Sequence, residues 1–321
     1  MVILAALVLG FACNEPSIRT GDAHSSNQVQ DSVANVNLVV LGTVQDAGSP
    51  HIACTRACCR DLFLYPDTAR KVVCLGLMDN QARKSFLFEA TPDITAQMKA
   101  LKRLATFRDN ETPDGIFITH AHIGHYAGLM YLGKEAMNAE EVPVFAMPRL
   151  KLFLEHNGPW DQLVRNHNIA IQELRDKEKT QLSENLGVTP LLVPHRDEYS
   201  ETVGFIIQGP NKKALFIPDI DKWVKWDMNI IEVISGVDYA FIDGTFFDTE
   251  EINHRNISEI PHPFIIESME LFSELPLAER NKIFFIHFNH TNPVLNPASE
   301  ASREVIEKGF NIARFKDMFQ L

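Results

Sequence analysis

The chain has 321 residues, a length that suits one large domain or two small ones. Hydrophobic residues make up 45% of it, an ordinary share for a globular protein with a sizeable core. Acidic residues outnumber basic ones by 42 to 30, the formal net charge is −12, and no basic stripe runs along the chain. We therefore expect no nucleic-acid partner, although a bound metal can still supply local positive charge for phosphate chemistry.

The chain begins with an apolar segment, 2–12, that Cys13 follows directly. The segment is too short to span a bilayer, which needs about 20 residues, but it suits the core of a signal peptide. We predict a signal or lipoprotein leader over 1–13, lipidation of Cys13 with membrane attachment through it, and a polar tether over 14–35. The protein would then be exported, as a periplasmic or membrane-anchored bacterial lipoprotein. The alternative is a hydrophobic N-terminus or first strand in a cytoplasmic protein.

Apolar runs with strand-like lengths and turn residues between them alternate with helical patterns over the rest of the chain. The predicted strands are 36–42, 72–78, 85–89, 115–118, 142–147, 188–193, 203–208, 214–217, 239–242 and 282–286. The predicted helices are one opening at 91–93, then 125–136, 149–156, 160–167, 263–274 and 299–308. Two mixed sets of strands, with helices between and outside them, predict an α/β fold that forms an αββα sandwich in a single domain over 36–321.

Three histidines follow the strand 115–118, at His120, His122 and His125. Side-chain direction repeats every two residues in extended chain, so His120 and His122 point to the same side. Imidazoles this close need a reason to tolerate one another, and a divalent metal provides one. This spacing favours a metal site over three unrelated histidines.

Further candidate ligands follow later strands, at His195, Asp219 and His287. Ligands gathered at strand ends around one cleft are typical of sites in α/β proteins. Imidazole and carboxylate together suit zinc, and also iron or manganese. Such an ion lowers the pKa of its water toward about 7 and so provides hydroxide as a nucleophile. The alternative, scattered surface or core histidines, stays open for each of these three residues.

The order of these motifs resembles the metallo-β-lactamase-fold superfamily, whose hallmark is H-x-H-x-D-H after a strand. Within it, the chain is most similar to the branch of pyrroloquinoline quinone biosynthesis protein B and its relatives. The resemblance covers roughly 37–318, and the stretches that carry it are 41–43, the cysteines of 54–59, 90–93, 243–246 and 286–293. The quinone-pathway protein itself usually lacks the two leading histidines, so this chain departs from it in the direction of the hydrolases.

The resemblance implies two metal sites that share one carboxylate. His120, His122 and His195 would hold the first ion, with Asp219 as a bridge to the second. His125 and His287 would complete the second site together with Asp219.

Gly124 stands where relatives carry a carboxylate for the second ion. Glycine has no side-chain ligand atom, so the second site is short of one, unless Asp46 or Asp221 substitutes. The sequence does not select between them. We expect zinc as the cofactor, as one or two ions, with iron or manganese as alternatives.

His262 falls where related phosphodiesterases carry a histidine that helps to protonate the leaving group. Asp243, at a neighbouring strand end, would orient it, as a carboxylate orients a general-acid histidine. Both are therefore candidate catalytic residues. The alternative is a histidine that caps the helix starting near Pro263.

A cysteine cluster lies in the long loop after the first strand, and His51, Cys54, Cys58 and Cys59 resemble the structural zinc knuckle of some relatives. Thiolates and an imidazole in one short loop suit a closed tetrahedral zinc site. Buried or redox-active thiols are the alternative.

Three functions remain open at this point. The first is a metal-dependent hydrolase that acts on a small-molecule phosphodiester or other ester through metal-bound hydroxide. The second is a metal-dependent oxidoreductase, as the quinone-pathway resemblance allows. The third is a metal-binding protein without turnover. No residue pattern names the substrate.

Overall fold

The structure, a computed structural model, describes residues 35–252 and 260–321. These residues belong to one unit, Ala34–Leu321. The predicted leader, the lipidated Cys13 and all but the last residue of the predicted tether lie outside the described residues and stay predictions.

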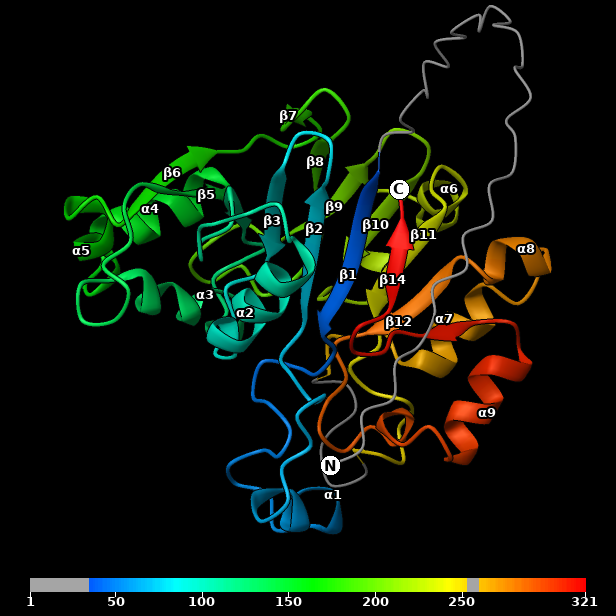
Figure 1. Cartoon of the computed structure of the whole chain (residues 1–321). Helices are drawn as coiled ribbons and strands as arrows, with labels where there is room; N and C mark the ends of the chain where they lie inside the picture. The colour runs from blue at the N-terminus through cyan, green and yellow to red at the C-terminus, as the bar shows by residue number, and fades with distance from the viewer. Residues whose placement is uncertain (1–34, 253–259) are drawn as a thin grey trace, which may run out of the picture. The chain divides into compact units, whose positions relative to one another are not determined.

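The first half of the chain, joined by the last strand, forms a seven-stranded sheet. Its strands are Val36–Gly42 (β1), Cys74–Asp79 (β2), Lys84–Phe88 (β3), Gly115–Phe117 (β4), Val142–Ala146 (β5), Ile169–Glu173 (β6) and Met318–Gln320 (β14). They lie in the order β14-β1-β2-β3-β4-β5-β6. Pairing is antiparallel from β14 to β3 and parallel from β3 to β6. The last strand thus lies beside the first (Figure 1).

The second half forms another seven-stranded sheet. Its strands are Thr180–Gln181 (β7), Gly187–Leu192 (β8), Val203–Gln208 (β9), Lys213–Ile217 (β10), Tyr239–Asp243 (β11), Ile283–Ile286 (β12) and Asn311–Ile312 (β13). They lie in sequence order with β13 at one edge, antiparallel from β7 to β10 and parallel from β10 to β13.

Three apolar layers show how the sheets and helices stack. The layer between the sheets is rich in phenylalanine: Phe88 and Phe117 of one sheet stack at 4.9 Å and meet Phe205 and Phe216 of the other. A second layer joins the first sheet to the helices that cover its outer face, Ile94–Leu104 (α2), Ile123–Tyr126 (α3), Ala127–Leu132 (η2), Pro148–His156 (α4) and Trp160–Arg165 (α5). A third joins the second sheet to Ile230–Ser235 (α6), Ile265–Leu271 (α7) and Glu300–Glu307 (α9). This is an αββα sandwich in a single domain, which confirms the predicted fold class.

The remaining helical segments are short. They are Ala57–Arg60 (α1), Asp61–Phe63 (η1), Trp223–Lys225 (η3), Leu277–Arg280 (α8) and Pro293–Leu295 (η5). No helix in the described ranges is both long and apolar enough to cross a membrane.

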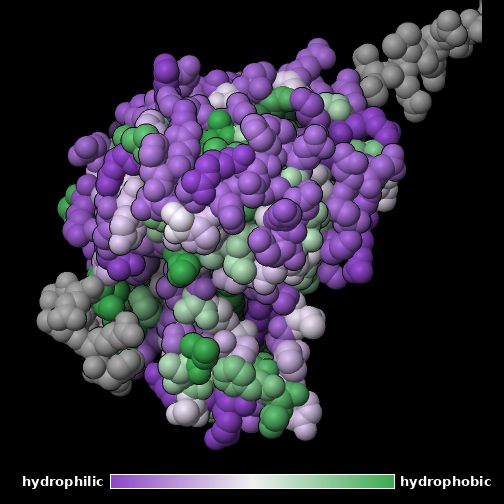
Figure 2. Space-filling model, turned by 90° about the vertical axis from the view of Figure 1, so that its left-hand side faces the viewer, coloured by the Kyte–Doolittle hydropathy of each residue, from purple (hydrophilic) through white to green (hydrophobic). Residues whose placement is uncertain are grey.

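The segment that carries α1 protrudes from the sandwich at the bottom of Figure 1. Figure 2 shows a mostly hydrophilic face, with hydrophobic side chains gathered on this protruding segment. Among its exposed large apolar residues are Ile52, Phe63, Leu64 and Tyr65. The segment also carries the cysteine cluster, so its place beside the ends of the sheets matters for the site.

The prediction of one α-helix over 125–136 is wrong. The α-helix α3 ends at Tyr126, and the 3₁₀ turns of η2 follow it. The reason is pairing with a neighbouring segment. The Ala90 N–H donates to the His125 carbonyl at 2.9 Å, and the Gly128 N–H donates to the Ala90 carbonyl at 2.8 Å. A Cβ on Gly128 would lie 2.1 Å from the Thr91 carbonyl oxygen, so only glycine permits this approach.

Candidate metal centre

The residues predicted as ligands, and the catalytic candidate Asp243, come together at one end of the two sheets, because each ends a strand or soon follows one that ends there. His120 and His122 follow β4, His125 lies in α3, His195 follows β8, Asp219 follows β10, Asp243 ends β11 and His287 follows β12. The strand-end pattern in the sequence therefore predicted which of these side chains meet.

The first group consists of His120, His122, His195 and Asp219, whose ligand atoms all lie within 4.8 Å of one another. Oδ2 of Asp219 is 3.5 Å from Nε2 of His120, 3.9 Å from Nδ1 of His122 and 3.2 Å from Nε2 of His195. Tetrahedral zinc, with bonds of about 2.0–2.1 Å, separates its ligand atoms by about 3.3 Å. Three imidazoles and one carboxylate at these separations therefore suit a tetrahedral divalent ion.

The second group consists of His125, His287 and Asp46, again with ligand atoms within 4.8 Å of one another. Nε2 of His125 also lies 3.9 Å from Oδ2 of Asp219. Of the two candidate carboxylates for the place opposite Gly124, Asp46 lies in the group. Asp221 is not, because its Oδ1 lies 3.2 Å from Nδ1 of His195, on the outer side of that ring.

Buried ligand atoms without partners support metal binding at both groups. Oδ1 of Asp46 and the Nε2 atoms of His125 and His287 in the second group, and Nε2 of His195 in the first, are buried, and none has a hydrogen-bond partner in the described part of the chain. Buried polar atoms are almost always hydrogen-bonded, so these four atoms need an explanation. A divalent cation bound by these lone pairs supplies it, and the residues fit such a group.

Two parallel relays fix the orientation of His120 and His287. The Thr119 hydroxyl donates to Oε1 of Glu89 at 2.6 Å and lies 2.9 Å from Nδ1 of His120. The Thr245 hydroxyl donates to Oδ1 of Asp243 at 2.7 Å and lies 2.9 Å from Nδ1 of His287.

A hydroxyl has a single hydrogen to give, and in each relay the carboxylate takes it. The Nδ1 atom of the imidazole must therefore donate to the hydroxyl oxygen. Nε2 of His120 and of His287 then carries a lone pair toward the site. These outer partners do what such partners do in metal sites, fixing the tautomer and ring position of a ligand.

The other imidazoles also have outer partners. Nε2 of His122 is 3.1 Å from Oε2 of Glu198, and Nδ1 of His125 is 3.3 Å from Oε1 of Glu89. Glu89 is fully buried and has a φ of 85°, and His287 has a φ of 69°. Left-handed backbone at non-glycine residues costs free energy and is concentrated at functional sites.

Burial sets the protonation of the ligands. Burial, together with neighbouring His125, lowers the pKa of His120 well below its ordinary value, and burial lowers the pKa of His287 to about 4. Both rings are thus neutral at pH 7. Burial would raise the pKa of Asp219, but the imidazoles of His262 and His195 outweigh it and hold that pKa well below its ordinary range. Burial disfavours the charged ring of His125, but Glu89 outweighs burial and raises the pKa of His125 to about 9. Neutral imidazoles and an ionised carboxylate are the forms that bind metal, so His125 has to release a proton when it binds an ion.

His262 lies beside the first group. Its Nδ1 is 2.9 Å from Oδ2 of Asp243 and 3.2 Å from Oδ1 of Asp219. Burial disfavours the charged ring, but these carboxylates outweigh burial and raise the pKa of His262 well above its ordinary value. It does not cap α7: the first residue outside that helix is Phe264, whose N–H donates to Glu267 at 2.9 Å.

The cysteine cluster differs from the expectation at one residue. Cys54, Cys58 and Cys59 meet His290, and not His51, with ligand atoms within 4.8 Å of one another. Nδ1 of His290 lies 3.3 Å from Sγ of Cys59. The ring of His51 lies against that of His290, with centroids 4.7 Å apart and the planes tilted by 32°, and Nδ1 of His51 accepts the Ala53 N–H at 3.2 Å. Three thiols and one imidazole form the donor set of a structural zinc site.

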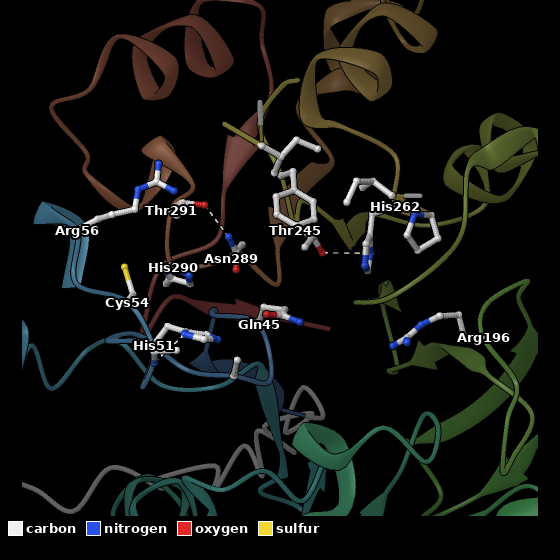
Figure 3. Close-up of a pocket in the computed structure, with 16 residues that line it drawn as sticks. Gln45, His51, Cys54, Arg56, Arg196, Thr245, His262, Asn289, His290 and Thr291 are labelled. Carbon is white, nitrogen blue, oxygen red and sulfur yellow. Dashed lines mark hydrogen bonds between the residues drawn. The ribbon is translucent and has the colours of Figure 1, made fainter. Parts of the chain in front are cut away.

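A cavity of about 520 Å³ lies between the cysteine cluster and His262. Figure 3 shows Arg56 on one side of it and Arg196 on the other, with Thr245 and Asn289 between them. Among the lining residues that the structure describes, none is acidic. The charged side chains of the lining are thus two arginines, in a protein whose net charge is −12, and Nη1 of Arg196 also lies 3.7 Å from Oε1 of Glu198 outside the lining.

Sequence reasoning missed several of these residues. Glu89, Thr119 and Thr245 position ligands, Glu198 contacts His122, and His290 replaces His51. Glutamate and threonine are common residues, so nothing in a single sequence marks those at the outer positions as partners of metal ligands. His290 could have been found, because it follows the strand 282–286 in the same stretch as His287.

The fold and the site together define a metallo-β-lactamase-like protein. A profile of the Beta-lactamase superfamily domain matches residues 84–288, and the chain belongs to that superfamily. Within it, the chain is similar to Coenzyme PQQ synthesis protein B of Methylobacterium sp. (strain 4-46), with 24% identity over 303 residues, 86% of this chain and 96% of that protein. The predicted resemblance to both is confirmed.

Solved structures agree with the fold. Zn²⁺-bound PqqB from Methylobacterium extorquens superposes with a TM-score of 0.73 at 20% identity, over 89% of this chain and 100% of that one. A diphosphatase from the PhnP family superposes with a TM-score of 0.61 at 20% identity, over 89% and 97%. At such identities the likeness concerns the fold, and the chemistry has to be argued from this chain's own residues.

Proposed function

We propose that this protein is a metal-dependent hydrolase of a small anionic ester, with a phosphodiester as the best candidate. The observation that carries the proposal is the position of His262. This protonatable ring, held by Asp243, lines the cavity and lies directly beside the four-residue group formed by His120, His122, His195 and Asp219. A nucleophile site with a proton donor next to it is what ester hydrolysis needs.

The residues divide the work as follows. His120, His122, His195 and Asp219 would hold a divalent ion, which would lower the pKa of its water toward about 7 and polarise the ester oxygen. His262, its Nδ1 held by Asp243, presents Nε2 for protonating the oxygen that leaves. Thr119 and Glu89 keep Nε2 of His120 turned into the site.

The cavity supports an anionic substrate. Arg56 and Arg196 direct their guanidinium groups toward the space between them (Figure 3). Guanidinium groups match phosphate and carboxylate geometry. Phe246, Ile252 and Ile260 line the same cavity with apolar surface. An ester with one anionic and one apolar part fits both kinds of lining.

The test begins with protein stripped by a chelator and reloaded with zinc or manganese. We expect hydrolysis of bis(p-nitrophenyl) phosphate only with added metal, and its loss in His120→Ala, measured as p-nitrophenolate release. Activity that persists in His120→Ala would overturn the assignment of the first group. No metal-dependent turnover on a panel of phosphodiesters, lactones and neutral esters would overturn the hydrolase and favour a metal-binding protein without turnover.

A second candidate is a metal-dependent oxidoreductase, which the similarity to Coenzyme PQQ synthesis protein B favours. Metal content separates the two functions. Zinc or manganese in the purified protein supports hydrolysis, whereas one iron per chain with oxygen uptake supports oxidation.

A further inference from the structure

The side chain of Asp46 fills the space that a side chain at position 124 would need. A Cβ added to Gly124 would lie 1.6 Å from Cβ of Asp46, 2.4 Å from its Cα and 2.9 Å from its Cγ. Real Cβ atoms do not approach other atoms this closely, so any side chain at 124 would collide with Asp46. The carboxylate of Asp46 therefore lies where a short side chain from position 124 would put its own end group.

Asp46 is aimed at two histidines that belong to no other described cluster. Its Oδ1 is buried and has no hydrogen-bond partner in the ranges that the structure describes. This oxygen lies 3.8 Å from Nε2 of His287, and Nε2 of His125 completes a set within 4.8 Å. The Thr245 relay turns the lone pair of His287 toward the same point.

The backbone is fixed directly before Asp46. Val44 forms β-bridges to Val72 and to Phe288, the residue after His287. The Gln45 N–H donates to the Phe288 carbonyl at 2.8 Å, and Gly48, at a φ of 78°, turns the chain back with its N–H on the Gln45 carbonyl. The loop after β1 is thus tied to the loop after β12 just before Asp46, and a turn follows Asp46.

We propose that Asp46 is a metal ligand, which with His125 and His287 holds a second ion beside the first, and that Gly124 is required because it leaves room for Asp46. Asp219, whose Oδ2 is 3.9 Å from Nε2 of His125, would be near enough to serve as a shared ligand. One carboxylate, two imidazoles and a shared carboxylate suit zinc or manganese. The proposal rests on metal binding at the first group, but not on hydrolysis.

The test is the number and affinity of bound ions in the full chain, measured by elemental analysis and by titration with zinc. Asp46→Ala should bind one ion fewer than the unmodified protein, with affinity for that ion reduced by more than the roughly 10–100-fold that loss of an outer partner costs. Asp61→Ala is the matched control: it removes an exposed carboxylate from the same long loop and should leave the count unchanged.

Gly124→Ala tests the second half of the proposal. It should displace Asp46 and weaken the same ion, and the double variant should bind it no worse than Asp46→Ala alone, because both changes act through one side chain. An unchanged ion count in Asp46→Ala refutes Asp46 as a ligand, and full second-ion affinity in folded Gly124→Ala refutes the role of the glycine. If Gly124→Ala fails to fold, the ion count of Asp46→Ala still tests whether Asp46 is a metal ligand. Two bound ions without hydrolysis would leave this inference intact and defeat only the proposed function.

Discussion

Nδ1 of His290 lies 3.3 Å from Sγ of Cys59, although the two residues are 231 positions apart in the chain. The same nitrogen is 3.7 Å from Sγ of Cys58. A zinc ion bound here would join the loop after β1 to the loop after β12, the two loops that also carry Asp46 and His287.

We predict that His290→Ala loses one zinc per chain and that His51→Ala keeps it. The rings of the two histidines lie in contact, so the two variants remove equal side chains from neighbouring places, and only that of His290 lies in the group with the thiols. Zinc released to a colorimetric chelator measures the ion, and thermal unfolding measures its contribution. For a domain of this size a loss of 1 kcal/mol lowers Tm by about 2–4 °C.

Equal zinc content in the two variants would contradict this assignment. If both variants and Cys58→Ser hold as much zinc as the unmodified chain, the cysteines are buried or redox-active thiols instead. Reactivity of the thiols toward a disulfide reagent would then identify them.

Features that depend only on residues close together in the chain could be predicted from the sequence. His120 and His122 share a side because of strand geometry, and β1 and the β2–β3 and β9–β10 hairpins follow from apolar runs with turns between them. The two strands of each hairpin are neighbours in the chain, so their pairing needs no long-range information.

The rest depends on contacts between distant segments. His290 meets the cysteines only because β12 brings its loop beside the one after β1. The strands β6, β7, β13 and β14 were not predicted, and β14 exists as a partner of β1 from the opposite end of the chain. The contact between Gly124 and Asp46 likewise joins two segments that are distant in the chain. From the sequence alone, Asp46 and Asp221 were equal candidates for the ligand that Gly124 cannot provide.

The second prediction concerns the proton that His262 would deliver. His262→Gln should lower kcat by about 10²–10⁴-fold on diesters with alkyl leaving groups, the range for general acid catalysis. The loss should be much smaller with p-nitrophenolate, which leaves without protonation. Steady-state kinetics on a series of leaving groups measures this difference.

Metal content serves as the control for this variant, because Nδ1 of His262 is also 3.2 Å from Asp219. We expect an unchanged ion count. A loss that is the same for every leaving group would contradict the role as a general acid and leave His262 as a positioning residue for Asp219.

The third prediction concerns the two arginines of the cavity. Arg56→Ala and Arg196→Ala should each raise KM for a phosphodiester up to about fivefold, since exposed ion pairs contribute up to about 1 kcal/mol. KM for a neutral ester should not change. Arg165→Ala, which removes an exposed guanidinium on α5, is the control for net charge. Equal effects on charged and neutral esters would argue against an anion-binding role.

The last prediction concerns Glu251, which supports the wall of the cavity. It accepts hydrogen bonds from the Thr291 hydroxyl and from the Phe247 N–H at 2.8 Å. Burial disfavours the carboxylate and raises the pKa of Glu251 from 4.5 to about 7, despite these donors. Between these two values the folded protein holds a proton that the unfolded chain has released.

Stability should therefore fall as pH rises from about 4.5 to about 7 and then change no further through this group. A shift of this size corresponds to about 1–3 kcal/mol. Glu251→Gln resembles the protonated form, so its free energy of unfolding should exceed that of the unmodified protein by a margin that grows from pH 5 to pH 8. Urea denaturation across this range measures the difference. A constant difference would mean that Glu251 is ionised throughout, with the Thr291 and Phe247 donors strong enough to offset its burial.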